Sequence, residues 1–269
     1  MSELPLTGER VIEEAYRRSP GLHAIYLMHV ASYQFAEPLV RGKRVLDLGC
    51  GSGYGAQMLA ETAADVVGVD VSSEAIAYAA SHHSAPNLSH RLIVAGERLP
   101  FADASFDVVV SFQVIEHVWE DAAYVQEARR MLRPGGQLVM ITPDRRHRLL
   151  PGQRPWNRWH VREYGAAGFR ALIESSGFNV KLRFMTASGG IDALELKRYR
   201  ALKWVTLPFT FPGCPESFRK WGLNLLHRFQ GQGPADAASQ FKVEDISIGD
   251  DPTRSLNLVA VATQFPRES

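Results

Sequence analysis

The chain has 269 residues, of which 45% are hydrophobic and 22% are charged, and its formal net charge is +1. These values are typical of a globular protein with a large core, and they exclude a chain that is disordered throughout. They also exclude a global basic field for nucleic acid, so nucleic acid is not an expected partner.

The sequence contains two cysteines, a number too small for a disulfide framework. The first residues carry no secretory signal, and no uncharged stretch reaches the roughly 20 apolar residues of a membrane-spanning helix. We therefore expect a soluble cytoplasmic protein without a transmembrane segment.

Short apolar runs alternate with segments of helical periodicity. The runs expected to form strands are residues 45–48, 66–69, 92–95, 108–112, 138–142, 179–185 and 256–262. Most are apolar at consecutive positions, as in strands that helices cover on both faces. Helices are expected at residues 56–63, 73–82, 121–132 and 166–175. The alternation predicts an α/β fold with a mainly parallel sheet.

Two segments lie outside this alternation. Residues 1–42 are expected to form an N-terminal helical cap on a central domain made of residues 43–187 and 255–269. Residues 188–254 form an insertion between the sixth and seventh strands and are rich in aromatic side chains. We expect this insertion to act as a substrate cap or as a homodimer surface, although its aromatics also suit a small core of their own.

The sharpest motif is a buried strand that runs into a glycine-rich turn, with the sequence VLDLGCGSGYG at residues 45–55. Glycines without Cβ atoms let a ligand approach the backbone, whose N–H groups point at it. Asp70 ends the next strand, where a carboxylate can accept both ribose hydroxyls of an adenosine. Together these features predict a cofactor that contains adenosine, although residues 51–56 also satisfy the dinucleotide fingerprint.

Asp47 bears on the choice between these cofactors. A carboxylate two residues before the loop repels a pyrophosphate but favours an ammonium group, such as that of S-adenosylmethionine (SAM). The alternative is that Asp47 only braces the loop by accepting N–H hydrogen bonds.

Five motifs resemble, in order and spacing, those of the class I SAM-dependent methyltransferases. They are VLDLGCGSGYG, VVGVD at 66–70, ERLPFADASFD at 97–107, VVSFQVIEH at 109–117 and LRPGGQLVMITP at 132–143. The resemblance covers about residues 43–143. It implies SAM as cofactor and a Rossmann-like sheet of seven strands in the order 3-2-1-4-5-7-6, with the seventh strand antiparallel.

The same resemblance implies a set of cofactor-binding residues: Gly49, Gly51, Gly53, Asp70, Val71, Gly96, Glu97 and Gln113. Asp47, from the charge argument above, and Cys50, within the glycine-rich turn, complete the expected set. In this set Asp70 holds the ribose, Val71 packs on adenine and Gln113 lies near the methyl group. Ala95 stands where many relatives have an aspartate that binds the adenine amino group. Adenine recognition is therefore expected to depend on backbone groups or water.

Three shorter motifs resemble a subgroup whose members often act in pathways for surface polysaccharides and other glycans. They are TGER at 7–10, HVASYQFA at 29–36 and NRWHVREY at 157–164. We expect O-methylation of a sugar, a glycan or a phosphorylated glycan intermediate. A small aromatic, quinone or natural-product acceptor is the alternative, and a SAM-binding module without activity is an alternative from another class.

A hydroxyl acceptor must lose a proton during methyl transfer, and histidine suits that task near neutral pH. His117 and His160 follow the fourth and fifth strands, at the carboxyl edge of the sheet where α/β folds bind ligands. We expect one of them to act as the base, although a purely structural hydrogen-bonding role is equally compatible with the sequence.

The acceptor side is expected to include Arg10, Tyr16, Tyr33, Arg145 and Arg146. The planar guanidinium groups of the two loop arginines suit phosphate or carboxylate recognition. We expect no metal. Metal-linked relatives carry an E-x-x-E-H run that resembles residues 113–117, but Gln113 replaces its first glutamate.

Overall fold

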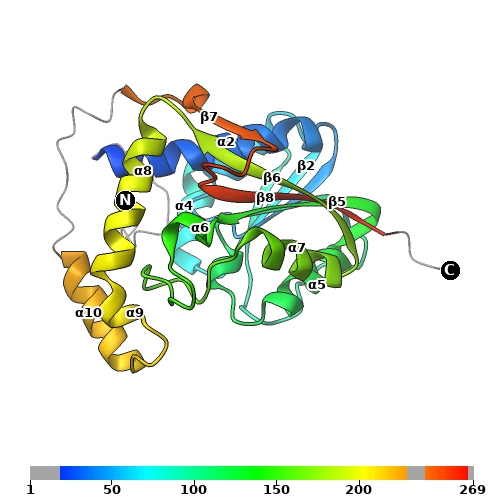
Figure 1. Ribbon diagram of the computed structural model, residues 1–269. Coiled ribbons are helices and arrows are strands. Elements are labelled where there is room, and N and C mark those ends of the chain that lie inside the picture. The colour runs from blue at the N-terminus through cyan, green and yellow to red at the C-terminus, as the bar shows by residue number, and fades with distance from the viewer. Residues whose placement is uncertain (1–18, 229–239, 266–269) are drawn as a thin grey trace.

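The structure is a computed structural model that describes residues 19–228 and 240–265 (Figure 1). Two residues expected on the acceptor side, Arg10 and Tyr16, lie outside the described residues, as does the TGER motif. No helix of the described ranges combines the length and hydrophobicity that crossing a bilayer requires.

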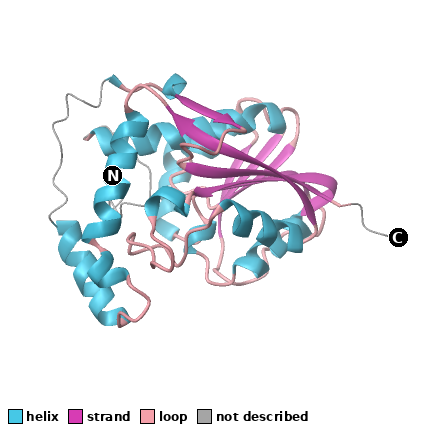
Figure 2. Cartoon of the chain, viewed as in Figure 1, coloured by secondary structure: helices cyan, strands magenta, loops and turns pink. Residues whose placement is uncertain are grey.

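One mixed sheet forms the centre of the molecule (Figure 2). Its strands are β1 (Arg44–Leu48), β2 (Asp65–Asp70), β3 (Leu88–Leu92), β4 (Phe106–Phe112), β5 (Leu132–Pro143), β6 (Phe178–Ala187), β7 (Ile246–Gly249) and β8 (Asn257–Gln264). They lie in the order β3-β2-β1-β4-β5-β8-β6-β7. The first five are parallel to one another, and β8 is antiparallel to both β5 and β6.

The predicted α/β class, the relative order of the seven expected strands and the antiparallel last strand are confirmed. The prediction of seven strands is wrong, because β7 adds an eighth strand that pairs with the outer edge of β6. This strand belongs to the 188–254 insertion, so the insertion contributes to the sheet.

The third strand was expected at residues 92–95 but lies at Leu88–Leu92. It is an edge strand with the sequence LSHRL, and none of its residues is buried. An edge strand that is not covered on both faces does not need a continuous apolar run. The apolar residues 92–94 instead continue past the strand, with Leu92 and Val94 exposed.

The helices are α2 (Pro20–Val40), α3 (Tyr54–Ala60), α4 (Ser73–His82), α5 (Asp121–Met131), α6 (Arg145–Arg148), α7 (Ala166–Ser175), α8 (Ile191–Val205), α9 (Leu207–Thr210) and α10 (Glu216–Arg228). Two short 3₁₀ helices, η1 (Ile115–His117) and η3 (Val243–Asp245), complete the described elements. Ser19 begins α2 and Ser72 begins α4, because each side chain accepts a hydrogen bond from a backbone N–H of the first turn.

Two hydrophobic clusters cover the two faces of the sheet. Val45 and Val66 belong to the cluster that α2 and α3 cover, whereas Leu46 and Val67 belong to the cluster that α5 and α7 cover. Neighbouring strand residues point to opposite faces, so each central strand supplies both clusters. Figure 1 shows α2 on one side of the sheet and α5 and α7 on the other.

Helix α2 therefore packs on the sheet as one of its covering helices, with Ala24, Ala36 and Val40 completely buried. Helix α8, which follows β6, contacts α2, α6 and β6. The helices α9 and α10 continue from α8 at one end of the molecule (Figure 1). This arrangement places both α2 and α8 beside the carboxyl edge of the parallel strands.

Candidate active site

The glycine-rich turn after β1 is held against β2 by backbone hydrogen bonds. The N–H groups of Gly49 and Cys50 both donate to the carbonyl of Val69, at 2.8 and 2.9 Å. Gly53 has a φ of 85° and approaches α4 so closely that an added Cβ would lie 2.6 Å from the Cβ of Ala79. An added Cβ at Gly51 would meet no atom within 4 Å, so the loop is open to a ligand at this point.

The Asp70 carboxylate lies at the carboxyl end of β2 and accepts hydrogen bonds from the backbone N–H groups of Gly51 (3.0 Å) and Ser72 (2.9 Å). It thereby connects the glycine-rich turn to the start of α4. Next to it, 57% of Val71 is exposed, which leaves an apolar surface beside the carboxylate. Gly96 and Glu97 are also exposed, in the turn that follows β3.

Asp47 is completely buried below the loop, where the Tyr33 hydroxyl donates to its Oδ2 at 3.2 Å. Burial raises the pKa of this carboxyl to about 7, and the hydrogen bond from Tyr33 opposes part of that rise. The Tyr33 ring packs directly over Gly55 and edge-on against Phe112, so a side chain at residue 55 would collide with it.

Gln113 joins the cofactor loop to the next part of the site. It follows β4 with a φ of 56°, and its N–H donates to the carbonyl of Ile141 at 2.8 Å. A left-handed glutamine is uncommon, and such backbone strain often occurs where a side chain must be aimed at a ligand.

A cavity of about 120 Å³ lies beside Gln113. Its walls come from α2, η1, the end of β5, α6, residues 156–160, α8 and the start of β8. Most of the charged and polar groups that face it are Gln113, Glu116, Arg148, His160, Glu195 and Arg198. The cavity is lined by both acidic and basic side chains, and Gln113 in its wall directly precedes Val114, which packs against Gly49 of the glycine-rich turn.

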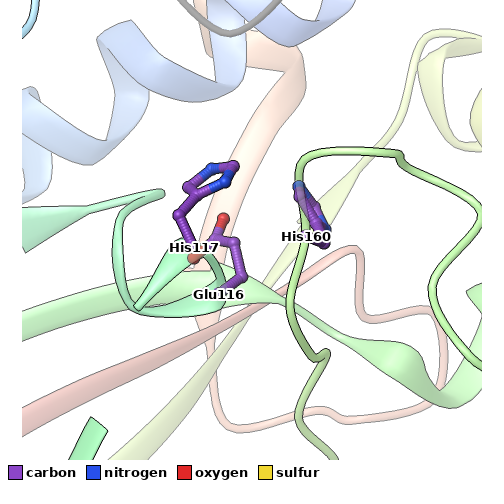
Figure 3. A group of neighbouring side chains, drawn as sticks. All are labelled: Glu116, His117 and His160. Carbon is purple, nitrogen blue, oxygen red and sulfur yellow. The ribbon is translucent and has the colours of Figure 1, made fainter. Parts of the chain in front are cut away.

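Two of the cavity residues, Glu116 and His160, lie close to His117, although the three come from two separate segments (Figure 3). One potential ligand atom from each lies within 4.8 Å of the others, and the two imidazole rings are 4.9 Å apart. Thr142 donates to Glu116 at 2.9 Å, and burial raises the pKa of Glu116. This set of groups can exchange protons, and its donor atoms are also of the kind that bind a divalent metal.

Comparisons with known proteins identify the chain's family. Residues 46–140 match the family described as "Methyltransferase domain". A probable S-adenosylmethionine-dependent methyltransferase of Mycolicibacterium smegmatis is 40% identical over 184 residues, which cover 67% of each chain. Another, from Mycobacterium tuberculosis, is 34% identical over 222 residues, which cover 76% of each chain. The chain belongs to the SAM-dependent methyltransferases.

The solved structure of a SAM-dependent methyltransferase from Mesorhizobium loti is similar in fold, with a TM-score of 0.55 and 17% sequence identity. The similarity covers 88% of this chain and all of that one. The Rossmann-like fold and the SAM cofactor of this methyltransferase are thus both confirmed.

The residues of the turn fit SAM in this methyltransferase. Gly51 leaves room for a ligand against the backbone, and the exposed Val71 offers an apolar surface beside the Asp70 carboxylate. The buried Asp47 carboxylate suits the ammonium group of SAM, because a cation would stabilise its ionised form. The Cys50 thiol is buried against Gly68, so only the backbone of Cys50 is placed to contact a ligand.

The described residues that were expected on the acceptor side lie outside the wall of this cavity. Arg145 donates to the carbonyl of Leu150 and Arg146 to that of Pro252, and neither side chain lines the cavity. Tyr33 is buried between the loop and the core rather than in the cavity wall.

The sequence interpretation missed residues of the cavity wall, namely Arg148, Trp156, Glu195, Arg198 and Tyr199. Arg148 follows Arg145 and Arg146 in the same loop, and the sequence did not distinguish it from them. The residues of α8 gave no signal of their own, because only the packing of α8 against α2 and α6 brings them to the site.

Arg148 and Glu163 form a buried ion pair next to His160. Arg148 Nε lies 2.9 Å from Glu163 Oε2, and Arg148 Nη2 lies 2.9 Å from Glu163 Oε1. Burial alone would raise the pKa of Glu163, but the charge of Arg148 and the hydrogen bond from His160 together lower it to about 2. Glu163 is therefore ionised throughout the neutral pH range.

This ion pair predicts a distinctive acid dependence of stability. The folded-state pKa of Glu163 lies below the ordinary value of 4.5, so the pair stabilises the fold fully above about pH 4.5 and loses that effect as the pH falls toward about 2. Urea unfolding of wild type and of Glu163→Gln should differ by about 3–5 kcal/mol at pH 7. The difference should shrink by about 1.4 kcal/mol per pH unit below pH 4.5. A difference that does not change down to pH 3 would show that Glu163 is not held ionised.

Proposed function

We propose that this methyltransferase transfers the methyl group of SAM to a hydroxyl group of a sugar or glycan. The observation that carries the proposal is the polar cavity beside Gln113, with His160 in its wall. It adjoins the expected position of the methyl group, and its groups can both donate and accept hydrogen bonds to a polyhydroxylated molecule.

The charges of the cavity wall favour a neutral acceptor over a phosphorylated one. The Arg148 guanidinium is engaged by Glu163, and Arg198 Nη1 lies 3.1 Å from the Glu195 carboxylate. Glu116 adds a further acidic side chain to the wall. An anionic phosphate placed here would approach carboxylates as closely as guanidinium groups, whereas a hydroxyl can bond to either.

Aromatic and amide side chains complete the case for a sugar. Trp156 and Tyr199 face the cavity, and both rings are fixed by Arg148, whose guanidinium lies 4.3 and 4.8 Å from their centroids. Asn157 and Asn257 also line the wall. A pyranose presents apolar C–H faces and polar edges, which match aromatic and amide surfaces respectively. The motif at residues 157–164 resembles glycan-pathway members, which agrees with this proposal.

Bound SAM supplies a methyl group already activated by its sulfonium. In the proposed reaction the loop after β1 and Asp70 hold the cofactor, and the residues of the cavity orient the acceptor. His160 accepts the proton of the hydroxyl group, since it is the one of the two candidate histidines that lines the cavity. The His117 ring lies 4.9 Å from that of His160, and its Nδ1 is 3.2 Å from the carbonyl of Trp159.

The proposal is tested with labelled SAM and a panel of acceptors. The panel contains neutral glycosides and oligosaccharides, nucleotide-sugars, sugar phosphates, phenols and quinols. We expect transfer to neutral sugar hydroxyls, with a higher KM for sugar phosphates. A Glu195→Gln variant should raise the KM for the sugar without changing SAM affinity. Glu61→Gln, at the exposed C-terminal end of α3 and outside the cavity wall, serves as the matched control.

Product with phenols or quinols alone would replace the sugar proposal by the aromatic alternative. Preference for sugar phosphates would show that the paired arginines are available to anions. SAM binding without transfer to any member of the panel would favour a binding module.

A further inference from the structure

His160 is supported from behind by a carboxylate that the sequence analysis did not single out. Its Nδ1 lies 3.0 Å from Oε1 of Glu163, three residues further along the same loop. The Glu163 side chain is completely inaccessible to solvent, and that of His160 is 5% exposed. On its other side, His160 faces Glu116 and His117 (Figure 3).

The charge of Glu163 determines which nitrogen of His160 carries a proton. Arg148 binds both carboxylate oxygens, each at 2.9 Å, and keeps the carboxyl ionised at neutral pH. An ionised carboxylate can only accept hydrogen bonds, so Nδ1 of His160 must be the donor. The basic lone pair of the neutral ring is then on Nε2.

The loop around this pair is fixed on several sides. The backbone N–H of Val161 donates to the carbonyl of Glu116 at 2.8 Å, which ties the His160 loop to η1. The Arg148 guanidinium packs against the rings of both Trp156 and Tyr199. The orientation of His160 is therefore set by the Glu163–Arg148 pair and by the backbone link to η1.

We propose that Glu163 is the positioning residue of the reaction: held by Arg148, it fixes the tautomer and orientation of His160 so that Nε2 accepts the acceptor's hydroxyl proton. This inference rests on the proposed function. The acceptor oxygen gains the methyl group of the sulfonium and loses its proton to Nε2. The sulfonium becomes a neutral thioether and His160 an imidazolium, whose charge Glu163 then stabilises.

The experiment compares Glu163→Gln with Glu163→Asp. Gln has the same shape but lacks the charge, and in either amide orientation its NH₂ group faces a donor of Arg148. Asp keeps the charge but is one methylene shorter. We expect Gln to lower kcat by roughly 10- to 100-fold at saturating SAM, with the acid limb of the pH–rate profile moved to lower pH. Asp should retain more of kcat than Gln.

A role in packing alone gives the opposite order, because Gln preserves the volume of the side chain. That order, or equal kcat in wild type and Glu163→Gln, would overturn the proposal. SAM affinity should stay within about twofold of wild type in both variants, which separates this role from damage to the cofactor loop.

A second measurement does not depend on the acceptor. The ¹⁵N resonances of the His160 ring, assigned with His160→Asn, should show a protonated Nδ1 and an unprotonated Nε2 in the neutral wild-type protein. The opposite tautomer in wild type would overturn the proposal even if neither Glu163 variant folds. If the wild-type tautomer is as expected but His160→Asn keeps full turnover, the assignment of His160 as the base is wrong, although Glu163 does orient the His160 ring.

Discussion

Replacing His160 with Asn is expected to lower kcat roughly 100-fold or more at saturating SAM. His160 is buried at the cavity wall and is held by Glu163, so it is placed to accept the proton of an acceptor hydroxyl. Affinity for SAM should change little, because the cofactor loop lies on the other side of Gln113. Initial rates with the best sugar acceptor, together with calorimetric titration of SAM, measure the two effects separately.

His117→Asn is the matched control for this variant. The two rings are 4.9 Å apart, but His117 is not in the cavity wall, so its replacement should have a much smaller effect on kcat. A larger loss with His117→Asn would exchange the roles of the two histidines. If both variants keep most of their turnover, the acceptor oxygen needs no base, as expected for a phosphate that is already ionised.

Replacing Asp47 with Asn is expected to weaken SAM binding by about 10- to 100-fold, the usual effect of losing a hydrogen bond to a charged group. Burial raises the pKa of Asp47 to about 7, so the ligand-free protein holds a proton there at lower pH. An ammonium group requires the ionised carboxylate. Wild-type SAM affinity should therefore fall by up to tenfold per pH unit below about pH 7, and this dependence should be absent in Asp47→Asn.

The pKa shift of Asp47 affects the free energy of unfolding with the opposite sign to that of Glu163. The folded-state pKa of Asp47 is raised above its ordinary value of 3.8, so its contribution to stability is fully present below that value and is lost as the pH rises through about 7. The ligand-free Asp47→Asn protein should thus be at least as stable as wild type at pH 8. Asp65→Asn is the control. Asp65 begins β2, at the end opposite to Asp70, and forms an ion pair with Arg44. Unchanged SAM affinity in Asp47→Asn would mean that Asp47 only braces the loop through Tyr33.

The elements with strong local signals were predicted with the right bounds. The helices at residues 73–82 and 166–175 were placed at their observed limits, α4 because Ser72 provides a side-chain cap and α7 because its apolar residues follow one face. The glycine-rich turn was located because the residues that form it are consecutive in the sequence. In contrast, β3 and β7 are short edge strands, which long-range pairing stabilises more than their own apolar content.

The cavity wall was harder to predict because its geometry depends on contacts distant in sequence. Asp144 accepts from the N–H of Arg146 and starts the one-turn helix α6, which directs Arg148 inward and leaves Arg146 exposed. Within a run of arginines nothing in the sequence distinguishes these positions. Glu195 and Arg198 enter the cavity only because α8 returns across the edge of the sheet, a placement that no local periodicity reveals.

The short strand β7 changes how the segment that contains α8 can vary between related enzymes. The segment leaves the sheet at Ala187, the end of β6, and returns at Ile246, which is the register partner of Ala187. Its two ends are therefore fixed side by side, and the entropy of closing such a loop rises only slowly with its length. Insertions or deletions here alter one wall of the cavity proposed to bind the acceptor, and they leave β1 and β2, on the far half of the sheet, unchanged. Changes in the length of this segment can therefore alter the preference for the acceptor, while the residues that bind the cofactor on β1 and β2 stay the same.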